Sequence, residues 1–185
     1  MPHIHTISYD QADHQLKEVY DQIIKSRGKL ADVHKIQSLN PDALVTHMAL
    51  YMSIMFGNSP LKRYQREMMA VVVSAVNKCE YCINHHEQAL LAYWKDEVRT
   101  GHLQGDRRKA DLTKPDELLC ELAEKLTKTP GEDYTALTGS LKEEEFTDRA
   151  ILDAVQVIAY FNFVNRLVLG LGVTHTDDEM KGYKY

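Results

Sequence analysis

Hydrophobic residues recur at three- and four-residue spacing in several separate segments of the chain. This periodicity predicts amphipathic helices over residues 10–27, 41–57, 61–76, 79–94, 115–126 and 147–170. No segment alternates apolar and polar residues over the length of a strand. The pattern therefore predicts an all-α fold.

Local signals give the expected ends of the first two helices. Asp10 can cap the start of the first helix, and Gly28 can end it in a left-handed conformation. Asn40 followed by Pro41 is typical of an N-cap and the first helical position.

Polar, Gly-containing stretches predict loops over residues 100–113, with a short helix, and over residues 129–141. A single helical turn is expected over residues 143–146, before the last long helix. The connector after the first helix is expected to be anchored by three buried side chains, Val33, Ile36 and Leu39.

The helices at 61–76 and 79–94 are separated by very few residues, so they are expected to form a tight antiparallel pair. A chain of 185 residues is typical of one domain with a core of its own. We therefore expect a single domain over residues 1–185, an orthogonal helical bundle built on this antiparallel pair. Small helical units of this kind leave apolar faces uncovered, which favours a homo-oligomer.

Composition narrows the possible partners and location. Charged residues make up 26% of the chain, the net charge is −5, and no basic stripe favours nucleic acid. The longest apolar stretch, residues 158–173, is interrupted by Asn162, Asn165 and Arg166, so no membrane span is expected. These three polar residues indicate either a pocket or subunit interface, or simply a solvated edge of the helix. No secretory signal is recognisable, which predicts a cytoplasmic protein.

Two of the three cysteines form a C-x-x-C pair, Cys79 and Cys82, and His86 follows one turn later. At i, i+3 and i+7 these three residues share one helix face. His86 can accept a thiol proton, as a base does beside a reactive cysteine. The position of Cys79 at the helix start favours a thiolate there, whereas proximity to His86 favours Cys82. The attacking sulfur is therefore left open by position alone.

Glu67 is a candidate third member of this site. It lies near the middle of the preceding helix, among apolar residues, where a carboxylate can orient His86 and stabilise its protonated form. The alternative is a solvated helix residue balanced by neighbouring cations.

Other polar residues around the motif are assigned to packing or to solvent. His85 points about 100° away from His86 on a regular helix and is expected to be an exposed neighbour. Tyr81 is expected to pack, and Cys120 lies among leucines as a small core residue. A zinc site is disfavoured because its ligands normally come from two clusters joined across a loop. No metal and no cofactor are therefore predicted.

The spacing Glu67-x11-Cys79-x2-Cys82-x3-His86 resembles the alkylhydroperoxidase D-like branch of the carboxymuconolactone decarboxylase superfamily. The segment at residues 156–166, Gln-Val-Ile-Ala-Tyr-Phe-Asn-Phe-Val-Asn-Arg, is also similar to the subgroup of peroxidase-related proteins. The resemblance covers about residues 40–173, and the first forty residues add less to it.

The resemblance implies an all-helical fold, symmetric homo-oligomers, and reduction of hydroperoxides at the expense of an external dithiol or thiol protein. It implies that Cys82 attacks, that Cys79 resolves the intermediate as a disulfide, and that His86 and Glu67 form a proton relay. The best-studied members carry a histidine where this chain has Tyr81, and a tyrosine cannot act as a near-neutral base. The intact cysteine pair argues against lactone decarboxylation.

Two other functions use the same residues. One is a dithiol–disulfide relay that does not itself reduce peroxide. The other is a non-enzymatic scaffold or redox sensor, whose thiols would stay unreactive at neutral pH.

Overall fold

The computed structural model describes residues 2–174, and every regular element among them is helical. The all-α prediction is confirmed. The elements are α1 (His14–Arg27), α2 (Asp32–Lys35), α3 (Pro41–Phe56), α4 (Arg63–Val76), α5 (Glu80–Trp94), α6 (Glu97–His102), the 3₁₀ turn η1 (Arg107–Lys109), α7 (Lys114–Lys128), α8 (Thr135–Glu143) and α9 (Asp148–Gly170).

Helix α4 is the centre of the larger part of the molecule. Ten consecutive residues of α4, from Gln65 to Ser74, are buried, because α5, α7 and α9 all pack around it. A helix that is covered on all sides must bury its polar residues as well as its apolar ones. This is why Glu67 lies inside the protein and not in solvent.

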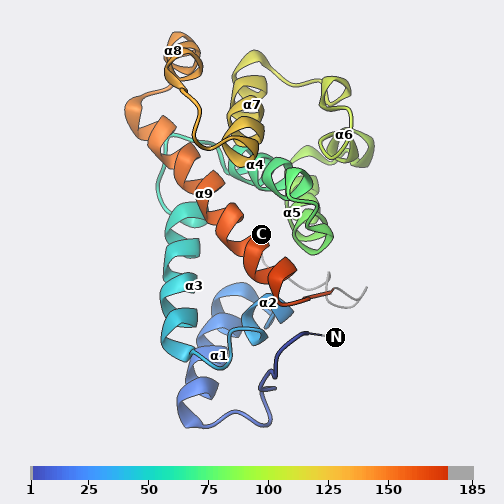
Figure 1. Cartoon of the computed structure of the whole chain (residues 1–185), viewed down its shortest axis with the longest axis vertical. Helices are drawn as coiled ribbons and strands as arrows, with labels where there is room; N and C mark the ends of the chain where they lie inside the picture. The colour runs from blue at the N-terminus through green and yellow to red at the C-terminus, as the bar shows by residue number, and fades with distance from the viewer. Residues whose placement is uncertain (1, 175–185) are drawn as a thin grey trace.

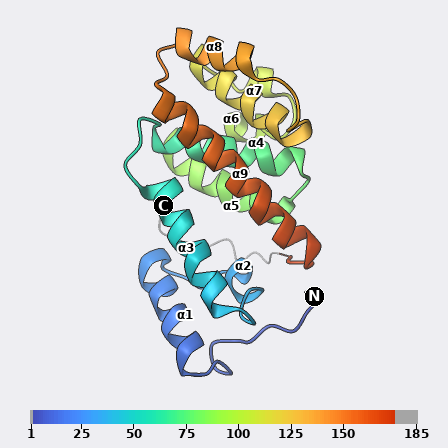
Figure 2. The ribbon, with the colours of Figure 1, turned by 60° about the vertical axis from the view of Figure 1, so that its left-hand side comes forward.

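Helices α1 to α3 form a second, smaller layer at one end of the molecule (Figures 1 and 2). Their own hydrophobic cluster includes Leu16, Tyr20, Ile23 and Leu44. Tyr51 of α3 packs against both this cluster and the larger core. The two cores therefore meet beside α3, and the candidate site lies at this junction.

Several predicted boundaries are confirmed by side-chain contacts. Gly28 ends α1 with φ of 86°, a left-handed conformation that glycine adopts without a Cβ clash. The Asn40 side chain accepts a hydrogen bond from the Ala43 N–H and so caps α3. The predicted cap Asp10 is wrong, because Asp13 caps α1 by accepting from the Leu16 N–H.

The loop predicted over residues 129–141 is confirmed only as far as residue 134, and the helical turn predicted over 143–146 is wrong. Helix α8 (Thr135–Glu143) begins inside the predicted loop and ends at the first residue of the predicted turn. Its threonines, serine and glycine have low helix propensity, but Leu137 and Leu141, one turn apart, are both buried. Tertiary burial outweighs the local preference.

The connector between α1 and α3 also differs in part from expectation. Ile36 is buried and Val33 is half-buried, as predicted, whereas Leu39 is 56% exposed and anchors nothing.

Helix α9 is long and apolar enough to cross a membrane by length and composition alone. Its most apolar window is 56% buried inside the protein, where it packs against α3, α4 and α7. Burial in the core of a helical fold accounts for this composition.

Candidate active site

The structure brings all four predicted site residues together. Three residues connect α4 to α5, so α5 packs closely along α4 and faces Glu67. Cys79 is the N-cap residue of α5, while Cys82 and His86 lie one turn apart on the same face. Cys79, Cys82 and His86 therefore share one helix face, as their spacing predicted.

Cys79 and Cys82 are free thiols whose Sγ atoms lie 2.9 Å apart. A disulfide requires about 2.0 Å, so a small side-chain movement would close the bond. The two sulfurs differ in access. Cys82 lines a cavity, whereas Cys79 has no exposed surface and lies behind it.

The two thiols share one hydrogen bond, so their ionisation is coupled. The hydrogen bond with Cys82 lowers the pKa of Cys79. The hydrogen bond with Cys79, and then burial, raise the pKa of the Cys82 thiol well above its usual value. Because one proton is shared between the sulfurs, the first ionisation belongs to the pair. Electrostatics favour charge on Cys79, whereas access favours reaction at Cys82.

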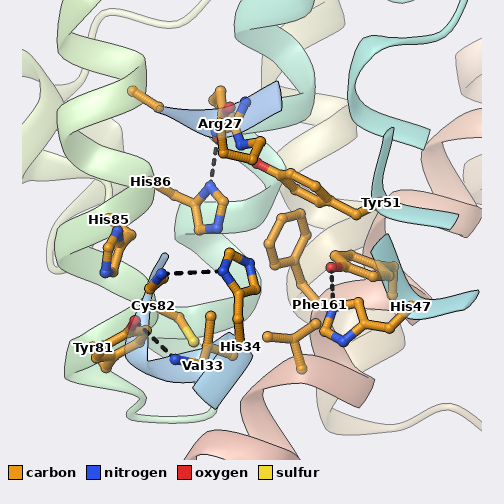
Figure 3. Close-up of a pocket in the computed structure, with 15 residues that line it drawn as sticks. Arg27, Val33, His34, His47, Tyr51, Tyr81, Cys82, His85, His86 and Phe161 are labelled. Carbon is orange, nitrogen blue, oxygen red and sulfur yellow. Dashed lines mark hydrogen bonds and ion pairs between the residues drawn. The ribbon is translucent and has the colours of Figure 1, made fainter. Parts of the chain in front are cut away.

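His86 is held by Glu67. The imidazole Nδ1 lies 2.6 Å from Glu67 Oε2, and the ring meets Phe161 edge to face at 4.4 Å. A carboxylate accepts hydrogen bonds only, so Nδ1 carries the proton and the other nitrogen, Nε2, keeps its lone pair. His86 is therefore oriented as a base toward the cavity (Figure 3).

Glu67 has two cationic or donor partners. His86 contacts one carboxylate oxygen, and Arg63, one turn earlier on α4, forms an ion pair with the other. Burial alone would raise the pKa of Glu67, but His86 and then Arg63 outweigh it and leave that pKa below its usual value. Arg63 is a site residue that sequence reasoning missed. Its i, i+4 spacing from Glu67 is the signal that could have found it.

Asn165 of α9 is another residue whose role was left open. It has no exposed surface; it donates to Ser74 Oγ and accepts from Asn77 in the turn between α4 and α5. It also hydrogen-bonds toward Cys82, which opposes the rise in that thiol's pKa. An asparagine in an apolar helix therefore marks the site here, and the solvated-edge alternative is wrong for Asn165.

The cavity beside Cys82 is about 80 Å³ in volume, which suits a small molecule. Tyr81, Cys82, His85 and His86 of α5 lie on one side of the cavity, and residues of α3 and α9 lie on the other; residues 27–34 complete the lining with Arg27, Val33 and His34 (Figure 3). The lining includes three tyrosines, at positions 51, 81 and 160, and four histidines, at positions 34, 47, 85 and 86. The first forty residues thus contribute part of the lining of the site.

His85 corrects the expectation of an exposed neighbour. It is partly buried, lines the cavity, and packs on Tyr81 with ring centroids 4.5 Å apart. Residues 27–34 lie against α5, so His85 and His86 both contact the cavity although they point in different directions from the helix. Tyr81 is buried as predicted, and its hydroxyl accepts a hydrogen bond from the Val33 N–H at 3.2 Å. This hydrogen bond connects α2 to α5.

Cys120 behaves as predicted. It is fully buried away from the cavity, and burial raises the pKa of its thiol to about 12. Among residues 2–174, no group of three or more His, Cys, Asp and Glu side chains is arranged to hold a metal ion.

His47 and Tyr160 form a polar chain at the far side of the cavity. His47 Nε2 lies 2.6 Å from the Tyr160 hydroxyl, and His47 Nδ1 lies 2.9 Å from Gln37 Oε1. The Gln37 amide nitrogen donates to the Val33 carbonyl, which fixes Oε1 as the acceptor. The Nδ1 of His47 therefore donates, and Nε2 accepts from Tyr160.

Two buried histidines should make the fold sensitive to mild acid. Burial lowers the pKa of His47 to about 4, and burial, then nearby cations, lower that of His34 to about 3. Unfolded histidine has a pKa near 6.5, so the unfolded state binds more protons below that pH and stability falls as pH falls. We expect the free energy of unfolding, measured in urea, to drop by about 3 kcal/mol between pH 7 and 4 on account of His47 alone.

The variant His47→Gln should show a shallower decline than the wild type, because it removes one such group. His14→Gln is the control, since the His14 side chain is 89% exposed. Equal slopes for His47→Gln and the wild type would contradict the assignment.

Every regular element of residues 2–174 is helical, and the fold encloses a buried cysteine pair beside a histidine–carboxylate pair. These features are those of an alkylhydroperoxidase D-like protein. The family model for PA26 p53-induced protein (sestrin) matches residues 1–185, and the chain belongs to this family. This match agrees with the alkylhydroperoxidase D-like family that the Glu67–Cys79–Cys82–His86 spacing resembles. No curated protein matches the chain significantly.

Several solved structures have the same fold. An uncharacterized peroxidase-related protein from Silicibacter sp. TM1040 is 28% identical, with a TM-score of 0.83 over 91% of this chain and 90% of that one. An uncharacterized peroxidase-related protein from Ralstonia eutropha JMP134, described as an alkylhydroperoxidase AhpD core, is 23% identical, with a TM-score of 0.87 over 97% of this chain and 94% of that one. The debrominase Bmp8, in complex with 2,3,4-tribromopyrrole, is 15% identical, with a TM-score of 0.78 over 94% and 91%.

Proposed function

We propose that the protein is a thiol-dependent peroxidase that reduces small organic hydroperoxides through a Cys79–Cys82 dithiol–disulfide cycle. One observation carries this proposal. The cavity-facing Cys82 has a second thiol 2.9 Å behind it, and His86, which is paired with Glu67 of α4, lies one turn along the same helix as Cys82. A nucleophile, a resolving thiol and an oriented base are the groups that the reaction needs.

The proposed cycle has three steps. His86 Nε2 accepts the Cys82 proton, and the thiolate attacks the terminal peroxide oxygen, so that the O–O bond breaks and Cys82 becomes a sulfenic acid. The protonated His86, stabilised by Glu67, returns its proton to the departing alkoxide, which leaves as an alcohol. The Cys79 thiol then displaces the sulfenic oxygen as water and closes the disulfide, which an external dithiol or thiol protein reduces.

Access to the cysteines supports a small oxidant. Cys79 has no exposed surface and Cys82 is only 3% exposed, so a folded protein, whether it brings a disulfide as oxidant or a thiol as reductant, reaches either sulfur only after local opening. The dithiol relay remains the alternative function, and the debrominase neighbour carries a different chemistry on the same fold. A cytoplasmic location and a homo-oligomeric state remain predictions.

The test is a single-turnover reaction. The reduced protein is mixed with one equivalent of cumene hydroperoxide and no reductant, and the products are read by mass spectrometry. We expect one Cys79–Cys82 disulfide and one equivalent of cumyl alcohol, while Cys120 stays a free thiol because its pKa of about 12 keeps it protonated. If cumene hydroperoxide oxidises the cysteine pair no faster than it oxidises free cysteine, and the pair nevertheless exchanges with an added small disulfide, the result would favour the relay.

A further inference from the structure

Arg27 is the last residue of α1 and lines the same cavity as Cys82. Its side chain is 7% exposed in total, so the guanidinium is largely removed from water. Figure 3 shows it at the rim of the cavity that holds Cys82 and His86. The catalytic cycle proposed above gives it no task.

Aromatic rings hold the guanidinium in place. It lies over the Phe56 ring at 4.6 Å and over the Tyr51 ring at 5.2 Å. Contacts of this kind use the flat faces of the guanidinium, and they leave its edge N–H groups for a planar acceptor such as a carboxylate.

The positive charge of Arg27 is not balanced by the cavity itself. Glu67 is the only carboxylate among the lining residues, and its two oxygens are taken by Arg63 and His86. Within residues 2–174, no carboxylate forms an ion pair with Arg27. Buried charges are normally paired, so a buried cation facing a cavity favours an anionic ligand there.

The field of Arg27 acts on the residues across the cavity. Burial is the main cause of the lowered pKa of His34, and Arg27 contributes to it after His47. Arg27 also opposes the burial-driven rise in the pKa of Tyr160. His34 and Tyr160 belong to different elements and both line the cavity, so the charge of Arg27 lies within electrostatic reach of both.

His34 adds a second donor. Its Nδ1 accepts a hydrogen bond from the Ala31 N–H at 3.1 Å, so the neutral ring carries its proton on Nε2. His34 lines the same cavity (Figure 3). A cation and a neutral N–H donor together form a recognition site for a carboxylate.

We infer that Arg27 determines substrate specificity by binding the carboxylate of a small organic hydroperoxide, whose peroxide group then lies against Cys82. The preferred substrates are therefore carboxylate-bearing hydroperoxides, and the cavity of about 80 Å³ favours short acids among them. This inference rests on the proposed peroxidase function for the reacting group, but the anion site itself does not.

The test compares two hydroperoxides that differ in charge and by a single methyl group: the tertiary hydroperoxide of isocaproic acid and its methyl ester. We expect the wild type to have at least a tenfold lower KM for the acid, with similar kcat values. In Arg27→Met, which keeps the stem but removes the charge, the two KM values should become equal. Arg108→Met removes an equal charge from a side chain that is 90% exposed and should keep the wild-type ratio.

Binding without turnover separates this inference from the proposed function. Isocaproate, but not isocaproamide, should slow the alkylation of Cys82 in the wild type, and this protection should be lost in Arg27→Met. Protection of Cys82 without peroxide turnover would support the anion site and contradict the proposed peroxidase function. Turnover with equal KM values for the acid and the ester in the wild type would contradict the role of Arg27. Because this second comparison uses the wild type alone, it does not depend on whether a variant folds.

Discussion

Replacing Cys82 by serine is expected to reduce the rate of hydroperoxide consumption by at least about a thousandfold, to the rate of free thiols. A serine hydroxyl cannot be ionised by an imidazole at neutral pH and does not react with peroxide as a thiolate does. The measurement is the loss of cumene hydroperoxide at saturating dithiothreitol, with protein unfolding followed in parallel. Since serine is close in size to cysteine, the fold should be retained.

Cys79→Ser is the matched variant, because it removes the other sulfur of the same pair. It should still form a sulfenic acid at Cys82 once, which dimedone traps, but should no longer form the intramolecular disulfide. The opposite result, with trapping in Cys82→Ser and none in Cys79→Ser, would reverse the roles of the two cysteines. The lowered pKa of Cys79 would favour that reversal if ionisation, and not access to the cavity, determined which cysteine attacks.

The core of the site was predictable because it depends on local geometry. Cys79, Cys82 and His86 lie on one helix, where the spacing fixes the shared face whatever the rest of the fold does. Glu67 was within reach of the same reasoning, because only three residues separate α4 from α5. Arg63 was missed although the same one-turn spacing connects it to Glu67.

The part of the cavity lining that comes from α1 and α2 could not be predicted from the sequence. Arg27 and His34 line the cavity beside Cys82 only because the tertiary fold brings the end of α1 and α2 to that cavity, and no periodicity in the sequence predicts this arrangement. The hydrogen bond from the Val33 backbone to Tyr81 is equally non-local. It does give Tyr81 a structural role at the position where better-studied relatives have a histidine.

The helix that was missed has the same physical origin. The sequence of α8 is rich in residues that favour turns, and only its packing against α7 and α9 makes the helix stable. His85 was misplaced for a related reason, because exposure on a helix depends on which neighbours cover it and not on the angle from His86 alone.

Glu67→Gln should lower the rate of peroxide reduction about a hundredfold, through two losses. The neutral amide can no longer stabilise the protonated His86, and it can turn its NH₂ group toward Nδ1, which would put the ring in the wrong tautomer. The second loss is structural. Arg63, whose side chain is 16% exposed, loses its carboxylate, at a cost of about 3–5 kcal/mol in the free energy of unfolding.

Kinetics and stability must therefore be measured together. Glu121→Gln is the control for the chemical change, since Glu121 pairs with Lys125 on the surface of α7 and should alter neither property strongly. The decisive comparison is a double-mutant cycle with His86→Asn. If Glu67 acts through His86, the double variant should be no slower than the slower single variant, because residues that act as one unit are not additive. Rate losses that multiply would mean that the two residues contribute separately, and the proton relay would then be wrong even if both matter for activity.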